Sequence, residues 1–172
     1  MTREIMHSIV DGDTEKFDRL VQHAIDEKFV TDNEKWNLLH LALVSVSMIP
    51  VPKMIRHLIE FGVDVNARDY YGNTPLHYAA RLKNVEIMEM LLNAHAEVDP
   101  INKDGLTPLH LMLTKKPHDL LAIEVLLSHG ANIEKSTQGG ISVWQYVKTI
   151  AHDEDSEMLN LFSRYVNIRN GK

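Results

Sequence analysis

A four-residue block occurs twice in this 172-residue chain, at an interval that constrains the fold. Thr74-Pro75-Leu76-His77 returns 33 positions later as Thr107-Pro108-Leu109-His110. Each block begins two residues after a glycine, Gly72 in the first case and Gly105 in the second. A period of this length is typical of repeat architectures, in which each unit buries its apolar face only against its neighbours. We therefore expect a stack of similar units.

The residues of the clearest unit predict a turn, a helix, a second turn and a second helix. Gly72 can adopt the positive φ of a tight turn, and Thr74 is a good N-cap for the helix that follows. Pro75 suits the first helical position, where its missing N–H costs nothing. A second run of apolar residues at helical spacing begins after Asn84.

Further copies of this unit can be followed along the chain. Asn37-Leu38-Leu39-His40 has the same register, and the longer interval to His77 is explained by the proline-containing segment 47–52. The two ends match only in part, as expected for capping units that have one face without a partner. We expect one domain of five units, at 1–31, 32–68, 69–101, 102–135 and 136–172.

These turns and blocks resemble those of the ankyrin-repeat family, strongly over residues 35–135 and weakly at both ends. The resemblance implies an all-α repeat solenoid, whose helix pairs are joined by β-hairpin-like turns that project as fingers beside a concave helical face. It implies that the block histidines bond to the backbone and to the threonine hydroxyl, which ties neighbouring turns together. The structural positions would be Gly72, Thr74, Pro75, His77, Gly105, Thr107, Pro108, His110 and His40. Since proteins of this family bind other proteins, we expect a binding module.

Composition and charge narrow the classes of function. The formal net charge of -6 argues against binding nucleic acid through phosphate contacts. The chain has no cysteine, which excludes disulfides and thiolate metal sites. The N-terminal residues do not have the pattern of a secretory signal, and no run approaches the ~18 apolar residues that span a bilayer. We expect a cytoplasmic protein that binds neither nucleic acid nor membranes.

Ten histidines raise the question of a metal or catalytic site. The block histidines occur once per unit, and a step of ~10 Å between packed helices is too wide for one metal with ligands at ~2 Å. His118-Asp119 and His152-Asp153 are isolated dipeptides with no partner cluster at helical spacing. The chain contains no phosphate-binding glycine loop and no nucleophile elbow. We predict that it is not an enzyme and has no metal, cofactor or small-molecule substrate.

Two adjacent tyrosines, Tyr70 and Tyr71, lie where the repeat normally carries small or charged residues at the finger tip. Tyrosine gives a large contact area with little side-chain entropy to lose, so this pair is the foremost candidate for partner contact. The alternative is that one ring packs along its own hairpin. Met112 replaces the usual alanine and could instead fill a gap in the core. The predicted partner-binding residues are Tyr70, Tyr71, Asn73, Tyr78, Arg81, Leu82, Lys103, Met112 and Lys115.

Three binding functions are compatible with these features. Small acidic ankyrin proteins resemble the immunity proteins of bacterial contact-dependent and polymorphic toxin systems, and an acidic chain could be steered quickly onto a basic toxin domain. This is the first hypothesis. It expects the chain to be a monomer, or a heterodimer with its target. The alternative is a viral or cellular inhibitor that sequesters a transcription factor. A general intracellular adaptor is the third.

Overall fold

The computed structural model describes residues 3–22, 25–44, 50–114, 116–136, 140–151 and 156–169. Within these residues the chain forms ten α-helices that follow one another as five pairs, with no strand longer than an isolated bridge. The chain is therefore an all-α repeat solenoid. The helices are α1 Arg3–Asp11, α2 Thr14–Val21, α3 Leu38–Val44, α4 Pro52–Glu60, α5 Pro75–Leu82, α6 Val85–Asn93, α7 Pro108–Leu113, α8 Leu120–Ser128, α9 Val143–Ile150 and α10 Ser156–Arg169.

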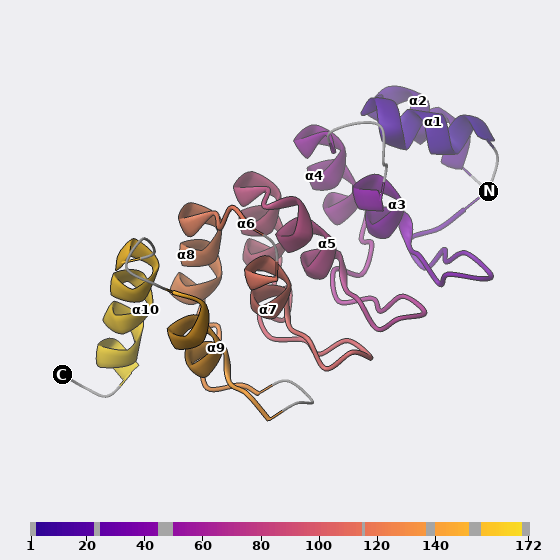
Figure 1. Cartoon of the computed structure of the whole chain (residues 1–172). Coiled ribbons are helices and arrows are strands. Elements are labelled where there is room, and N and C mark those ends of the chain that lie inside the picture. Colours follow the sequence, from indigo (N-terminus) through magenta and orange to yellow (C-terminus); the bar gives the residue numbers. More distant parts are fainter. Residues whose placement is uncertain are drawn as a thin grey trace.

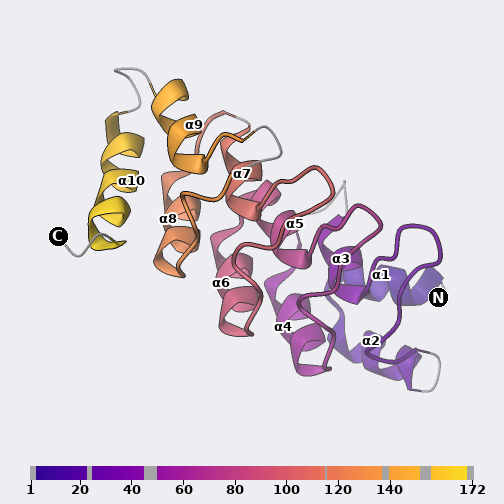
Figure 2. The same ribbon diagram turned by 90° about the horizontal axis from the view of Figure 1, so that it is seen from below.

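The helix pairs stack side by side into two layers (Figures 1 and 2). One layer holds α1, α3, α5, α7 and α9, in which α5 packs between α3 and α7. The other layer contains α4, α6 and α8, and α6 packs between its two neighbours. Turns project from the edge of the first layer, and α1 and α10 lie at opposite ends of the stack (Figure 1). No helix of the described residues is long and apolar enough to cross a membrane.

The block residues start the helices of the first layer. Thr107 accepts a hydrogen bond from the His110 N–H at 3.4 Å, and the His110 side chain accepts one from the Thr107 N–H at 3.3 Å. This reciprocal capping box satisfies two backbone donors that a helix start would otherwise leave unpaired. The same arrangement joins Thr74 to His77. Pro75 and Pro108 occupy the first helical positions, as the sequence predicts.

Second-layer helices begin at polar caps and bury one apolar face. The Asn84 side chain accepts from the Ile87 N–H at 3.1 Å, and Asp119 accepts from the Ala122 N–H at 3.0 Å. Among the described residues, a cluster of buried apolar side chains runs from α1 to α10. In α5 the cluster includes Leu76, which is fully buried. The core is thus continuous through the stack, as expected when units bury surface only against each other.

Candidate protein-binding surface

The turn before α5 is closed by one buried acid. Asp69 accepts hydrogen bonds at Oδ1 from the backbone N–H groups of Tyr71 at 2.9 Å and Asn73 at 2.7 Å. Its own N–H donates to the Asn73 carbonyl at 2.9 Å. Gly72 has a φ of 78°, and a Cβ there would lie 3.3 Å from the Asn102 Cα. The chain therefore crosses the tip in one tightly bonded conformation; we call residues 69–73 the tyrosine finger.

Tyr70 and Tyr71 project from the tyrosine finger into solvent. Their side chains are 56% and 54% exposed, so neither ring is folded away along its own hairpin. The rings contact each other edge to face, with centroids 5.3 Å apart. Lys103, from the next finger, places its Nζ 4.1 Å from the Tyr70 ring centroid, within the range of a cation–π contact. The ring–ring contact and the Lys103 contact both restrain these two side chains.

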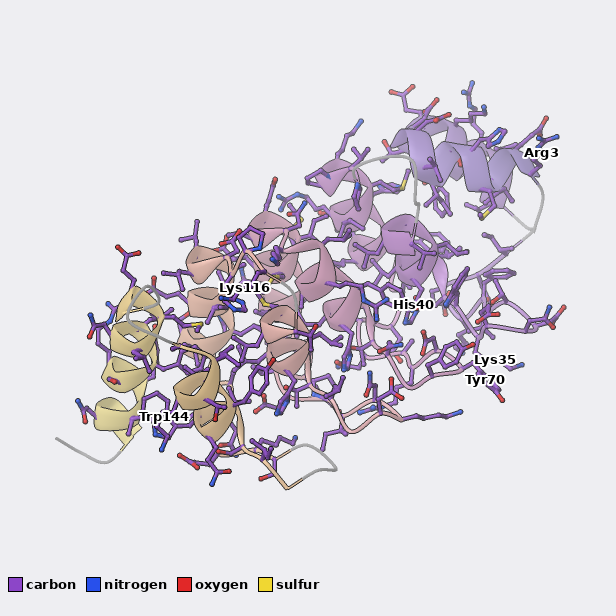
Figure 3. All side chains as sticks on the ribbon, in the orientation of Figure 1. Arg3, Lys35, His40, Tyr70, Lys116 and Trp144 are labelled. Atoms are coloured by element: carbon purple, nitrogen blue, oxygen red, sulfur yellow. The ribbon has the colours of Figure 1, made fainter. Side chains whose placement is uncertain are left out.

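Backbone hydrogen bonds link the tyrosine finger to its neighbours on both sides. The Tyr70 N–H donates to the Glu34 carbonyl at 2.7 Å, and the Lys103 N–H donates to the Tyr71 carbonyl at 2.9 Å. Figure 3 shows Tyr70 close to Lys35 at the finger edge of the stack. Three successive fingers thus form one continuous edge, with the tyrosines at its centre.

The helical surface beside this edge is only partly available. Arg81 is exposed and lies over the Tyr78 ring at 5.3 Å, and Leu82 is 46% exposed. Tyr78 itself is half-buried: its hydroxyl donates to Asp69 Oδ2 at 2.6 Å, and its ring meets His40 edge to face. Burial and the bond to Asp69 raise the pKa of the Tyr78 hydroxyl, so it remains a proton donor. Tyr78 therefore helps to hold this surface in place through its contacts with Asp69 and His40.

Two residues predicted to contact a partner are buried, so those predictions are wrong. Asn73 is 6% exposed, and its side chain accepts from Asn102 Nδ2 at 2.9 Å, which joins adjacent fingers. Met112 is 1% exposed and belongs to the apolar core, where it fills space. Lys115, also predicted to contact a partner, lies outside the described residues.

The block histidines connect each finger to the next. His77 Nδ1 accepts from the Thr74 N–H at 3.0 Å, so its proton is on Nε2, which donates to the Leu106 carbonyl at 3.2 Å. His40 Nε2 likewise donates to the Asn73 carbonyl at 3.0 Å. The cap of His40 differs, because Asn37 takes the place of the threonine.

Burial keeps these imidazoles neutral. It lowers the pKa of His77 to about 4, although the bond to the Leu106 carbonyl acts in the opposite direction. Burial also lowers the pKa values of His40 and His110. The described residues contain no group of three or more His, Asp or Glu side chains that could hold a metal ion. The role of these histidines is to hold neighbouring fingers of the stack together.

One exposed residue on this edge was not singled out from the sequence. Ile101 is 43% exposed and directly precedes the finger of Lys103. Its carbonyl accepts from Arg68 Nη1 at 2.9 Å, and Arg68 also pairs with Glu97 at 3.2 Å. The sequence does contain a signal for this residue, because an isoleucine stands just before a finger. Its side chain would extend the apolar contact area beside the tyrosines.

A stack of helix pairs with fingers along one edge defines a class of repeat protein that binds through an extended surface. Comparison with family models places residues 5–102 in a model of three ankyrin repeats and residues 104–138 in a model of one ankyrin repeat. The chain therefore belongs to the ankyrin-repeat family, whose repeats are protein–protein interaction modules.

Individual relatives are similar over part of their length. Palmitoyltransferase AKR1 of Lachancea kluyveri is 32% identical over 79% of this chain and 18% of its own length. Ankyrin repeat protein OPG189 of variola virus is 32% identical over 51% of this chain and 16% of its own. Ankyrin repeat and SOCS box protein 6 of Homo sapiens is 28% identical over 88% of this chain and 38% of its own. The chain thus spans less than two fifths of the length of these relatives.

Proposed function

We propose that the chain binds another protein through a surface made of Tyr70, Tyr71, Lys103, Arg81 and Leu82, which we call the finger surface, and that this binding is its function. The observation that carries the proposal is the pair of exposed, ordered tyrosines. Tyrosine rings, which have few rotamers to lose, are among the side chains most enriched at binding hot spots. No catalytic step is part of this function.

The form of binding that we favour is inhibition by sequestering a regulatory protein, in a eukaryotic cell or during viral infection. The relatives named above come from a yeast, a virus and human, and these sources support the eukaryotic or viral setting of this form. They give no support to the bacterial immunity role that the acidic composition first suggested. An adaptor role would use the same surface with a different consequence for the partner.

A photo-crosslinking experiment tests where the partner binds. We would replace Tyr71 by the photoreactive residue p-benzoylphenylalanine in the full chain and, as a matched control, replace Leu121 in the same way. Leu121 is 63% exposed on α8, in the other layer of helices. A protein captured from position 71 and absent from position 121 is the expected result. Capture from position 121 alone would place the partner on the other face and overturn the proposal.

A further inference from the structure

The charged side chains of the central repeats are divided between the two layers of helices. Helices α3, α5 and α7 contain no aspartate or glutamate, and their only lysine or arginine is Arg81. Helices α6 and α8 contain no lysine or arginine and carry Glu86, Glu89 and Glu124. Lys83 directly follows α5, so it adds a second cation at the end of this first-layer helix. The net charge of -6 therefore does not describe the surface that the first layer presents.

Both cations of the finger surface lie over tyrosine rings. The Arg81 guanidinium carbon is 5.3 Å from the Tyr78 ring centroid, and Lys103 Nζ is 4.1 Å from that of Tyr70. Within the part of the chain that the structure describes, no carboxylate forms an ion pair with Arg81, whose side chain is exposed. A cation held on a ring face can still pair with a carboxylate from outside, because the ring carries no net charge.

A chain of contacts joins these two cations into one site. Asp69, the buried acid of the tyrosine finger, accepts from the Tyr78 hydroxyl at 2.6 Å. The ring that Arg81 covers is thereby fixed to the same finger whose tip carries the ring that Lys103 covers. Arg81 lies six residues beyond the first residue of α5, a distance of ~9 Å along the helix. The exposed side chain of Leu82 directly follows it. The finger surface therefore offers two cations together with exposed apolar area.

We propose that the finger surface recognises an acidic segment of the protein partner, with carboxylates on both sides of an apolar side chain. The carboxylates pair with Arg81 and Lys103, and the apolar side chain packs against the exposed tyrosines and Leu82. Asp104 follows Lys103 and offsets part of the charge there, so Arg81, with Lys83 nearby, is the stronger of the two cationic positions. This inference rests on the proposed function, because it names the chemistry of the partner at the same surface. It replaces the basic partner that the net charge suggests.

The acids of the other layer do not prevent this recognition at physiological salt. The Debye length is then about 8 Å, whereas packed helices of the two layers are ~10 Å apart. Nucleic acids and anionic membranes are less suitable ligands, because the first are bound by neutralising many phosphates and the second by clusters of roughly four to eight cations. Exposed tyrosines beside a leucine favour a protein segment, since aromatic side chains are enriched at protein interfaces.

The test uses two peptides that differ only in charge. The acidic peptide is acetyl-Glu-Asp-Leu-Phe-Asp-Glu-amide, which spans about 20 Å when extended, and its neutral match has the corresponding amide in place of each acid. The full chain, labelled at leucine methyl groups, is titrated with each peptide at about 0.15 M salt and followed by NMR. We expect the acidic peptide to shift the Leu82 methyl signals with a Kd of about 1 mM, and the Leu121 signals to stay unchanged. The neutral peptide should bind about five-fold more weakly, because each exposed ion pair contributes only a modest factor.

Two double variants with the same change in net charge locate the effect. Arg81→Gln/Lys103→Gln removes both cations of the finger surface and should bind the acidic peptide about five-fold more weakly, with its affinity for the neutral peptide unchanged. Lys53→Gln/Arg56→Gln removes two exposed cations from α4, in the other layer, and should bind both peptides as the parent chain does. Circular dichroism should show an unchanged fold for both. Equal weakening in the two double variants, or no preference of the parent chain for the acidic peptide, would overturn the proposal. So would binding of decathymidylate or of phosphatidylserine vesicles without binding of the acidic peptide.

The crosslinking experiment separates failure of this inference from failure of the proposed function. Capture of a partner at position 71, together with no preference for the acidic peptide, would retain the finger surface and overturn the acidic segment. Capture at position 121 alone, together with a preference for the acidic peptide that Arg81→Gln/Lys103→Gln removes, would overturn the proposed function and leave the acidic preference of this surface in place.

Discussion

At the scale of single residues, a buried acid determines how the exposed tyrosines are presented. Asp69 is 5% exposed and accepts hydrogen bonds from two backbone N–H groups of its own finger and from the Tyr78 hydroxyl. Tyr70 and Tyr71 therefore extend from a closed turn whose geometry is set from beneath. Under the proposed function, a partner would meet rings that have little conformational freedom left to lose.

The glycine of the tyrosine finger should be more sensitive to substitution than a glycine elsewhere with a similar φ. Gly72→Ala should destabilise the chain by about 2–3 kcal/mol, because strain at positive φ adds to a close approach to the Asn102 backbone. Gly130 has a φ of 89° and nothing within 4 Å of an added Cβ, so Gly130→Ala should cost only about 1 kcal/mol. Urea unfolding measures both; equal losses would mean that the contact with Asn102 is not tight.

The buried histidines predict how stability depends on pH. The folded pKa of His77, about 4, lies below its unfolded value of 6.5, so the unfolded chain binds the proton more readily. The resulting stability is present above pH 6.5 and is lost as the pH falls toward 4, by about 3 kcal/mol for this residue. His77→Gln, which can keep the cap as Gln145 does, should flatten that part of the curve. The free energy of unfolding would be measured by urea titrations from pH 4 to 8. The same pH dependence in His77→Gln and in the parent chain would contradict this assignment.

At the scale of the helices, the sequence predicts well where a helix begins. It predicts less well which environment a side chain occupies. Residues at the cap and first turn are governed by local chemistry, so the starts of α5 and α7 at Pro75 and Pro108 agree with expectation. Whether Met112 fills a gap or faces a partner depends on the volume left by α5 and α8, which no local rule gives. Asn73 was misassigned for a similar reason, since its partner Asn102 comes from another unit.

The last helix pair shows the same limit. A repeat register predicts that His110 bonds to the following finger, as His40 and His77 do, but how closely the two groups approach depends on where that finger lies in space. The division of the chain at residues 31, 68, 101 and 135 stays a prediction. The helix pairs are compatible with it but do not locate boundaries to a single residue.

Helix α5 offers a matched pair of leucines for testing its packing. Leu76 is fully buried, whereas Leu82 at the end of the same helix is 46% exposed. Leu76→Ala should destabilise the chain by about 2–5 kcal/mol through lost burial and a residual cavity. Leu82→Ala should change stability by less than about 0.5 kcal/mol. Thermal unfolding of the two variants distinguishes them, and a large loss for Leu82→Ala would show that its side chain packs more closely than its exposure indicates.

At the scale of the whole molecule, the finger surface depends on the stack and belongs to no single unit. The tyrosine finger is bonded to Glu34 on one side and to Lys103 on the other, and the histidines repeat such links beneath it. Because units of a solenoid stabilise one another through their interfaces, loss of one neighbour should disturb the tyrosines as well. The fold supplies a register, and in the function that we propose the residues outside the repeat pattern supply the binding properties.

The measurement that tests this account most directly is the affinity of the captured partner for three forms of the chain. Calorimetry should give the parent chain and the Leu121→Ala control the same Kd, since Leu121 lies in the other layer of helices. Tyr70→Ala/Tyr71→Ala should bind at least about 100-fold more weakly, as loss of two hot-spot rings costs about 3 kcal/mol or more. Its melting temperature should be unchanged, because both rings are exposed. Equal affinity of the double variant and the parent chain would contradict the central claim.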